Sequence, residues 1–114
     1  MAILNRENDS WLTWAIELMK RGLKPNDDEI TVHGPHEGAD YMWGEAECDT
    51  LEGGCYNVKF RTAHTNSKWD VRGVRVWSKH YNEPFPILKT KEIPPSWRQE
   101  IKSLKAELRK RKKD

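Results

Sequence analysis

The sequence predicts an α+β fold, in which an antiparallel sheet is packed by an N-terminal and a C-terminal helix. Two segments repeat apolar residues with helical spacing, one near each end, and the segments between them alternate apolar and polar residues. The length of 114 residues suits a single domain spanning 1–114. Apolar residues make up only 36% of the chain, so six tryptophans must supply much of the core.

The N-terminal helix is expected over residues 10–21. From Trp11 to Met19 the apolar residues recur at i, i+3, i+4 and i+7, which indicates a wide buried face. Asp9 or Ser10 could cap its free N–H groups, and Gly22 could end it.

The middle of the chain is expected to form three or four antiparallel strands arranged as a meander. Glu29–His33 is a short candidate strand, and residues 41–48 and 55–62 both alternate. Residues 69–78 alternate too, but the apolar parity changes after Gly73, which predicts a β-bulge there.

The register can be predicted because a slip of one residue would turn every side chain to the other face. We expect Glu45, Lys59 and Asp70 to form a ladder of opposite charges across three strands. The same register sets Phe60 beside Trp69 on the other face. That apolar face would comprise Met42, Ala46, Cys48, Val58, Phe60, Trp69 and Val71.

An irregular, proline-rich segment over 80–95 is expected to wrap the domain, and a basic helix over 96–111 to follow it. The wrap would be held by Tyr81, Phe85, Ile87 and Leu88. Ser96 and Gln99 have the spacing of a capping box. Trp97, Ile101, Leu104 and Leu108 form an apolar stripe at helical spacing. A second stripe consists of Arg98, Lys102, Lys105, Arg109 and Lys112.

Charge is sorted along the chain. Residues 25–58 contain no Lys or Arg but nine acids, whereas residues 96–114 carry eight bases and three acids. The net charge of +2 therefore conceals opposed patches, which bear on partners and not on fold.

The basic helix favours a non-catalytic binding protein that engages nucleic acid or a nucleoprotein. Cations along one helix face can neutralise phosphates and release counterions. We expect phosphate contacts from Arg98, Lys102, Lys105, Arg109 and Lys112, with a second patch formed by Arg61, Arg72 and Arg75. Tyr41 and Trp43 could stack bases on the polar sheet face, although cover of Trp43 by the second helix or the wrap is the simpler expectation.

The alternative is an inhibitor or adaptor that presents the acidic segment 27–52 to a basic protein partner. The residues expected to contact that partner are Asp27, Asp28, Glu29, Glu37 and Asp40. In composition alone, the short, Trp-rich and bipolar chain resembles accessory proteins of phages or mobile elements, and no family resemblance supports this comparison.

A small metal-dependent enzyme is the third hypothesis. His33, His36, Cys48 and Cys55 could supply zinc ligands, but the predicted faces place the two cysteines apart. His36 beside Glu37 is the best candidate for a catalytic base. We expect no catalytic residues, no metal and no cofactor.

Nothing in the sequence predicts a membrane segment or a signal peptide, so a soluble cytoplasmic protein is expected. The two cysteines are then expected to be free thiols, each either buried or in a loop.

Overall fold

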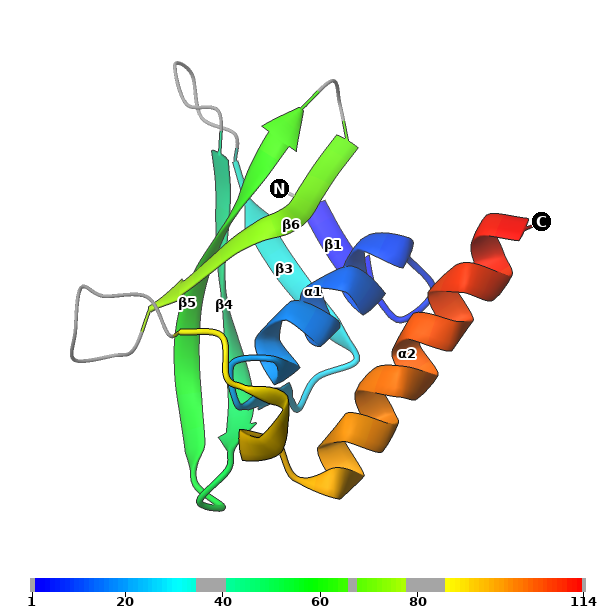
Figure 1. Cartoon of the computed structure of the whole chain (residues 1–114). Helices are drawn as coiled ribbons and strands as arrows, with labels where there is room; N and C mark the ends of the chain where they lie inside the picture. Colours follow the sequence, from blue (N-terminus) through cyan, green and yellow to red (C-terminus); the bar gives the residue numbers. More distant parts are fainter. Residues whose placement is uncertain (1, 35–40, 66–67, 78–85, 114) are drawn as a thin grey trace.

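The computed structural model describes residues 2–34, 41–65, 68–77 and 86–113. In these residues one sheet contains six strands, β1 (Ala2–Asn5), β2 (Leu23–Pro25), β3 (Glu29–His33), β4 (Tyr41–Thr50), β5 (Cys55–Thr65) and β6 (Lys68–Trp77). The helices are α1 (Asp9–Met19), α2 (Pro95–Lys113) and a short 3-10 helix, Thr90–Glu92. Figure 1 shows the sheet behind α1, with α2 beside α1. The α+β fold with one helix near each end is confirmed.

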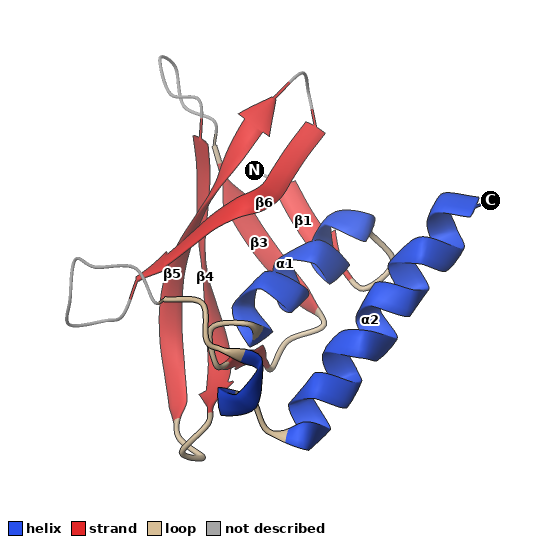
Figure 2. Cartoon of the chain, in the orientation of Figure 1, coloured by secondary structure: helices blue, strands red, loops and turns tan. Residues whose placement is uncertain are grey.

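The sheet is antiparallel throughout the described pairs, and its strand order is β1-β3-β4-β5-β6. Strands β3 to β6 form the expected meander (Figure 2). Strand β2 pairs with the end of β4 that β3 leaves uncovered. Strands β1 and β2 were not predicted, because three or four residues are too few to display an alternating pattern.

The β4–β5 hairpin has the predicted register. Ala46 is opposite Val58, and Glu45 is opposite Lys59. The Lys59 ammonium lies 3.8 Å from the Glu45 carboxylate on the exposed face. The buried face of the two strands contains Met42, Gly44, Ala46, Cys48, Val58, Phe60 and Thr62. The alternation of apolar residues therefore predicted both the pairing and the buried face.

The predicted β5–β6 register is wrong. Trp69 is opposite His64 instead of Phe60, and Asp70 is opposite Ala63 instead of Lys59, a displacement of four residues along β5. The prediction ended the first strand at residue 62, whereas β5 continues to Thr65 and β6 begins at Lys68. The turn is therefore elsewhere than predicted, and the position of the turn fixes the register of a hairpin. The charge ladder therefore stops at Glu45 and Lys59.

A register shift does occur where Gly73 predicted one. Arg61 is opposite Arg75 and Ala63 is opposite Asp70, so an advance of two residues on β5 corresponds to five residues on β6. Gly73 lies within this interval of β6. Beyond the shift, Phe60 is opposite Val76.

Helix α1 fills the inner side of the sheet. Its buried residues are those predicted: Trp11, Leu12, Trp14, Ala15, Ile16, Leu18 and Met19. The rings of Trp14 and Phe60 are 5.3 Å apart, so α1 packs directly on β5. Gly22, with φ of +79°, follows the helix as expected. The N-cap is Asn8 instead of Asp9 or Ser10.

Helix α2 lies against α1, and its Leu104 and Leu108 also pack against the core between α1 and the sheet. Ile101 is buried with Ile16 and Met19, while Trp97, Leu104 and Leu108 are half-buried beside them. The helix begins at Pro95, where proline's missing N–H and fixed φ are tolerated, so Ser96 does not cap it and the predicted capping box is wrong.

The described part of the proline-rich segment is held against α1. The Leu88 amide donates to the Lys20 carbonyl over 2.8 Å, and Ile93 is buried. Ile87 is exposed, so it does not hold the segment as expected, and Tyr81 and Phe85 lie outside the described residues.

Candidate functional site

The exposed side of α2 carries four cations, which we call the cationic stripe: Arg98, Lys102, Lys105 and Arg109. All four side chains are exposed, and none is in an ion pair within the described part of the chain. Lys112 continues the same spacing, but its side chain is outside the described set.

The two acids of α2 in the described residues lie on the other side of the helix. Glu100 pairs with Lys24 of β2 over 2.7 Å, and Glu107 pairs with Arg111 over 3.1 Å. At 3.6 residues per turn, positions 100 and 107 fall close to one line along the helix, roughly half a turn from the stripe. Both carboxylates are therefore directed away from the stripe, and neither neutralises its cations.

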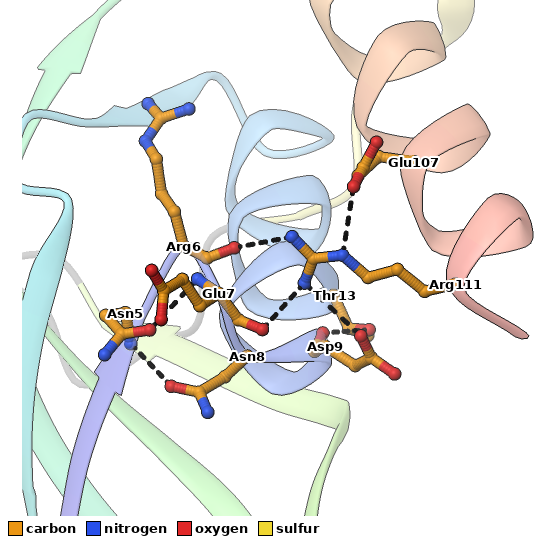
Figure 3. A network of polar contacts seen from close by, with 8 residues as sticks. All are labelled: Asn5, Arg6, Glu7, Asn8, Asp9, Thr13, Glu107 and Arg111. Atoms are coloured by element: carbon orange, nitrogen blue, oxygen red, sulfur yellow. Dashed lines mark hydrogen bonds and ion pairs between the residues drawn. The ribbon is translucent and has the colours of Figure 1, made fainter. Parts of the chain in front are cut away.

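Arg111 fixes the C-terminal part of α2 to the loop between β1 and α1 (Figure 3). Its guanidinium donates to the carbonyls of Arg6, over 3.0 Å, and Glu7, over 2.9 Å. It also lies 3.4 Å from the Asp9 carboxylate. The hydrogen bond to Glu107 raises the pKa of Arg111. Sequence reasoning missed this role, and the only signal was that Arg111 is four residues after Glu107.

A groove borders the cationic stripe. Its volume is about 400 Å³, and it is lined by Lys20, Ile87, Leu88, Thr90, Ile93, Arg98, Ile101, Lys102 and Lys105. These residues come from the end of α1, the segment before α2 and α2 itself. The sequence did not reveal the groove, because its walls are far apart along the chain.

Of the three cations expected to form a second patch, Arg61 does not join the stripe. Arg61 lies over the Tyr41 ring at 4.7 Å on the outer sheet face, opposite the face that α1 covers. Backbone register places Arg75 opposite Arg61, and Arg72 lies within the irregular interval. The side chains of Arg72 and Arg75 are outside the described set. Arg61, the one residue of the expected second patch whose side chain is described, is thus on a different face of the molecule from α2.

The outer sheet face also has an acidic hollow of about 340 Å³. It is lined by Asp27, Glu29, Ile30, Thr31, His33, Trp43 and Glu45. Trp43 is 36% exposed and its ring lies 4.6 Å from that of His33, so the expected cover of Trp43 is wrong. Asp28 pairs instead with Arg6. Glu37 and Asp40 lie outside the described residues.

The two cysteines are free thiols on different faces, as the alternation predicted. Cys48 is buried, and this burial raises the pKa of its thiol to about 12. Cys55 is exposed, with the Asn26 amide 3.5 Å from its sulfur. Within the described residues, no group of three or more His, Cys, Asp or Glu side chains is arranged to hold a metal ion. His36 and Glu37, the candidate base and its neighbour, are outside this set.

No protein family, curated protein or solved structure matches this chain. Among the described helices, none is long and apolar enough to cross a membrane.

Proposed function

We propose that this protein binds nucleic acid, alone or within a nucleoprotein, through the cationic stripe of α2. The observation that carries the proposal is the separation of charge around that helix. Four cations are exposed on one side, and both described acids are paired on the other. An ordinary solvated helix face mixes charges of both signs, whereas a phosphate-binding face gains from their separation.

The dimensions of the stripe suit a phosphate backbone. Eleven residue steps separate Arg98 from Arg109, which corresponds to about 16 Å of helix. Because double-stranded DNA carries one charge per about 1.7 Å of its axis, several phosphates fall within that length. Contacts of this kind are independent of base sequence, and they weaken as salt rises.

The test is a salt series measured by fluorescence anisotropy with a labelled duplex and a labelled single strand. Lys102, Lys105 and Arg109 are replaced together by Gln. The slope of log affinity against log salt should fall by about 0.7–0.9 for each lost phosphate contact, on every sequence tested. The apolar stripe that docks α2 is untouched, so the fold should persist.

The matched control replaces Lys89, Lys91 and Lys110 by Gln, which removes the same charge from exposed positions outside the stripe. Its salt slope should stay at the wild-type value. An equal decrease of the salt slope in the two variants would show that binding depends only on net charge and not on the stripe. Absence of wild-type binding at low salt would contradict the proposal.

A second candidate function is favoured by the acidic hollow. Asp27, Glu29 and Glu45 line this hollow together with the exposed Trp43, and an aromatic ring beside carboxylates suits a Lys or Arg side chain of a protein partner. This is the inhibitor or adaptor role. An arginine-rich peptide should quench the fluorescence of Trp43 and bind less well after Asp27→Asn with Glu29→Gln. The paired substitution Glu52→Gln with Glu92→Gln, at exposed acids elsewhere, should leave binding unchanged.

A further inference from the structure

The groove beside α2 combines an exposed apolar surface with a wall that is already in place. Ile87 is 60% exposed, the highest value among the large apolar side chains found exposed in the described residues. Ile93 and Ile101, which also line the groove, are buried. The Leu88 amide is bonded to the end of α1, which fixes this wall before any partner arrives. Such preorganisation reduces the entropy lost on binding.

The rim of the groove is cationic. Lys20, Arg98, Lys102 and Lys105 contribute to its lining, and no acidic residue does so among the described residues. Lys20 is engaged by Glu17 over 3.1 Å, whereas the three α2 cations are in no described ion pair. One carboxylate would leave most of these cations unpaired, so the rim is suited to a ligand with several negative charges.

The floor distinguishes between classes of polyanion. It is aliphatic, formed by Ile87, Leu88, Ile93 and Ile101. Nucleic-acid bases are held by stacking on aromatic rings, and no aromatic side chain lines this groove. An aliphatic floor instead buries Leu, Ile or Val side chains. Its chemistry therefore matches a protein segment and not a base.

We propose that this groove binds an acidic segment of a partner protein, with aliphatic side chains on the floor and carboxylates at Arg98, Lys102 and Lys105. This peptide site differs from the proposed nucleic-acid contact because its ligand also contacts the aliphatic floor. The two sites share three cations of the stripe. Arg109 belongs to the stripe alone, and Ile87 belongs to the groove alone. The two activities can therefore be separated by substitution.

The probe is a fluorescein-labelled peptide of twelve residues, with Glu and Leu placed so that both recur along one face. One control peptide has Ser in place of Leu, and another has Gln in place of Glu. The full chain should bind the Glu-Leu peptide at least tenfold more tightly than either control, because each control removes one of the two recognised features.

The decisive variant is Ile87→Ser, an exposed substitution that should not disturb the core. It should lower the affinity for the Glu-Leu peptide about tenfold and leave oligonucleotide binding unchanged. Ile3→Ser is the matched control, since Ile3 is 55% exposed on β1, outside the groove. Arg109→Gln should weaken binding of the oligonucleotide and leave binding of the peptide unchanged, whereas Lys102→Gln should weaken binding of both ligands.

Equal binding of the three peptides, or equal effects of Ile87→Ser and Ile3→Ser, would overturn the proposal. Sedimentation analysis of the protein without peptide tests whether a second copy of this chain occupies the groove. Self-association that Ile87→Ser abolishes would assign the groove to a second copy of this chain and would also overturn the proposal. Failure of oligonucleotide binding alone would leave the peptide result intact, so the two proposals fail separately.

Discussion

Helix α1 is packed on two sides, and the two interfaces differ in kind. Toward the sheet, Trp11 and Trp14 are wholly buried and Trp14 meets the ring of Phe60. Toward α2, Ile16 and Met19 meet Ile101, while three of the four residues in the apolar stripe of α2 remain half-buried. Ion pairs of Lys24 and Arg111 hold α2 at points far apart along its length.

This difference indicates that the sheet–α1 interface carries most of the stability and that α2 is a docked layer. Hydrophobic stabilisation is roughly proportional to the apolar area that is removed from water, and exposed ion pairs add little. A docked layer can vary its outer side at small cost to the fold. This is why the cationic stripe and the groove can be examined by substitution.

The largest effect should come from truncating the sheet–α1 interface. Trp14→Ala and Phe60→Ala should each lower the free energy of unfolding by about 3–5 kcal/mol, because each leaves a cavity in a fully buried site. Trp97→Ala, at the half-buried α1–α2 interface, should cost less than half as much. Urea denaturation measures all three, and equal losses would contradict the comparison.

Thiol reactivity should report on opening of the same interface. Cys48 is buried in the sheet core with a pKa of about 12, compared with an ordinary value of 9.0, so at pH 8 its thiolate is about a thousandfold rarer than that of an ordinary cysteine. An aromatic disulfide reagent should modify Cys55 quickly and Cys48 only after unfolding. Comparable rates for the two thiols would show that the core opens readily.

The same shift has a defined effect on stability. The folded state keeps the Cys48 thiol protonated up to about pH 12, whereas the unfolded chain loses this proton near pH 9. The contribution of this group to the free energy of unfolding is therefore fully present below pH 9 and is lost as pH rises toward 12. Cys48→Ala should remove this part of the alkaline loss of stability, as denaturation curves at several pH values would show.

Gly44 tests how tightly the sheet residues Phe60 and Thr31 pack around β4. A Cβ at this position would lie 2.7 Å from the Phe60 ring and 3.1 Å from the Thr31 carbonyl oxygen. Gly44→Ala should therefore cost about 1–3 kcal/mol through overpacking. Adding Phe60→Leu should recover part of that loss, and a purely additive double variant would show that the ring is not the obstacle.

Two buried threonines allow a smaller, matched comparison. The Thr62 hydroxyl has no hydrogen-bond partner within the described structure, whereas the Thr50 hydroxyl accepts the Gly54 amide over 3.0 Å. Thr62→Val should be neutral or stabilising by up to about 1 kcal/mol, and Thr50→Val should cost about 1 kcal/mol. Thermal denaturation distinguishes these signs, and a loss at Thr62 would reveal a partner for its hydroxyl.

The smallest effect on stability is expected at Arg111. Arg111→Gln removes the guanidinium contacts to Arg6, Glu7 and Asp9 but no part of the sheet core. Hydrogen exchange should accelerate in the last turns of α2 and stay unchanged in β4 and β5. Faster exchange in β4 as well would mean that α2 belongs to the same cooperative unit as the sheet.

Local periodicity was sufficient for much of the fold. The repeat in α1 and the alternation in β4 and β5 predicted the buried faces, because a wrong face would expose every apolar residue at once. The β5–β6 register depended on the position of a turn, and polar residues near Thr65 gave no sign that the strands continue. Strands β1 and β2 are shorter than any readable pattern and form through pairing with β3 and β4.

The candidate sites divide in the same way. Helical spacing alone aligned Arg98, Lys102, Lys105 and Arg109 on one side of α2, because that alignment follows from 3.6 residues per turn. Only the tertiary structure could separate Arg61 from that stripe, since it decided which side of the sheet α1 and α2 cover. Only the tertiary structure could assemble the groove, because packing brings Lys20, Ile87 and Ile101 together across more than eighty residues of chain.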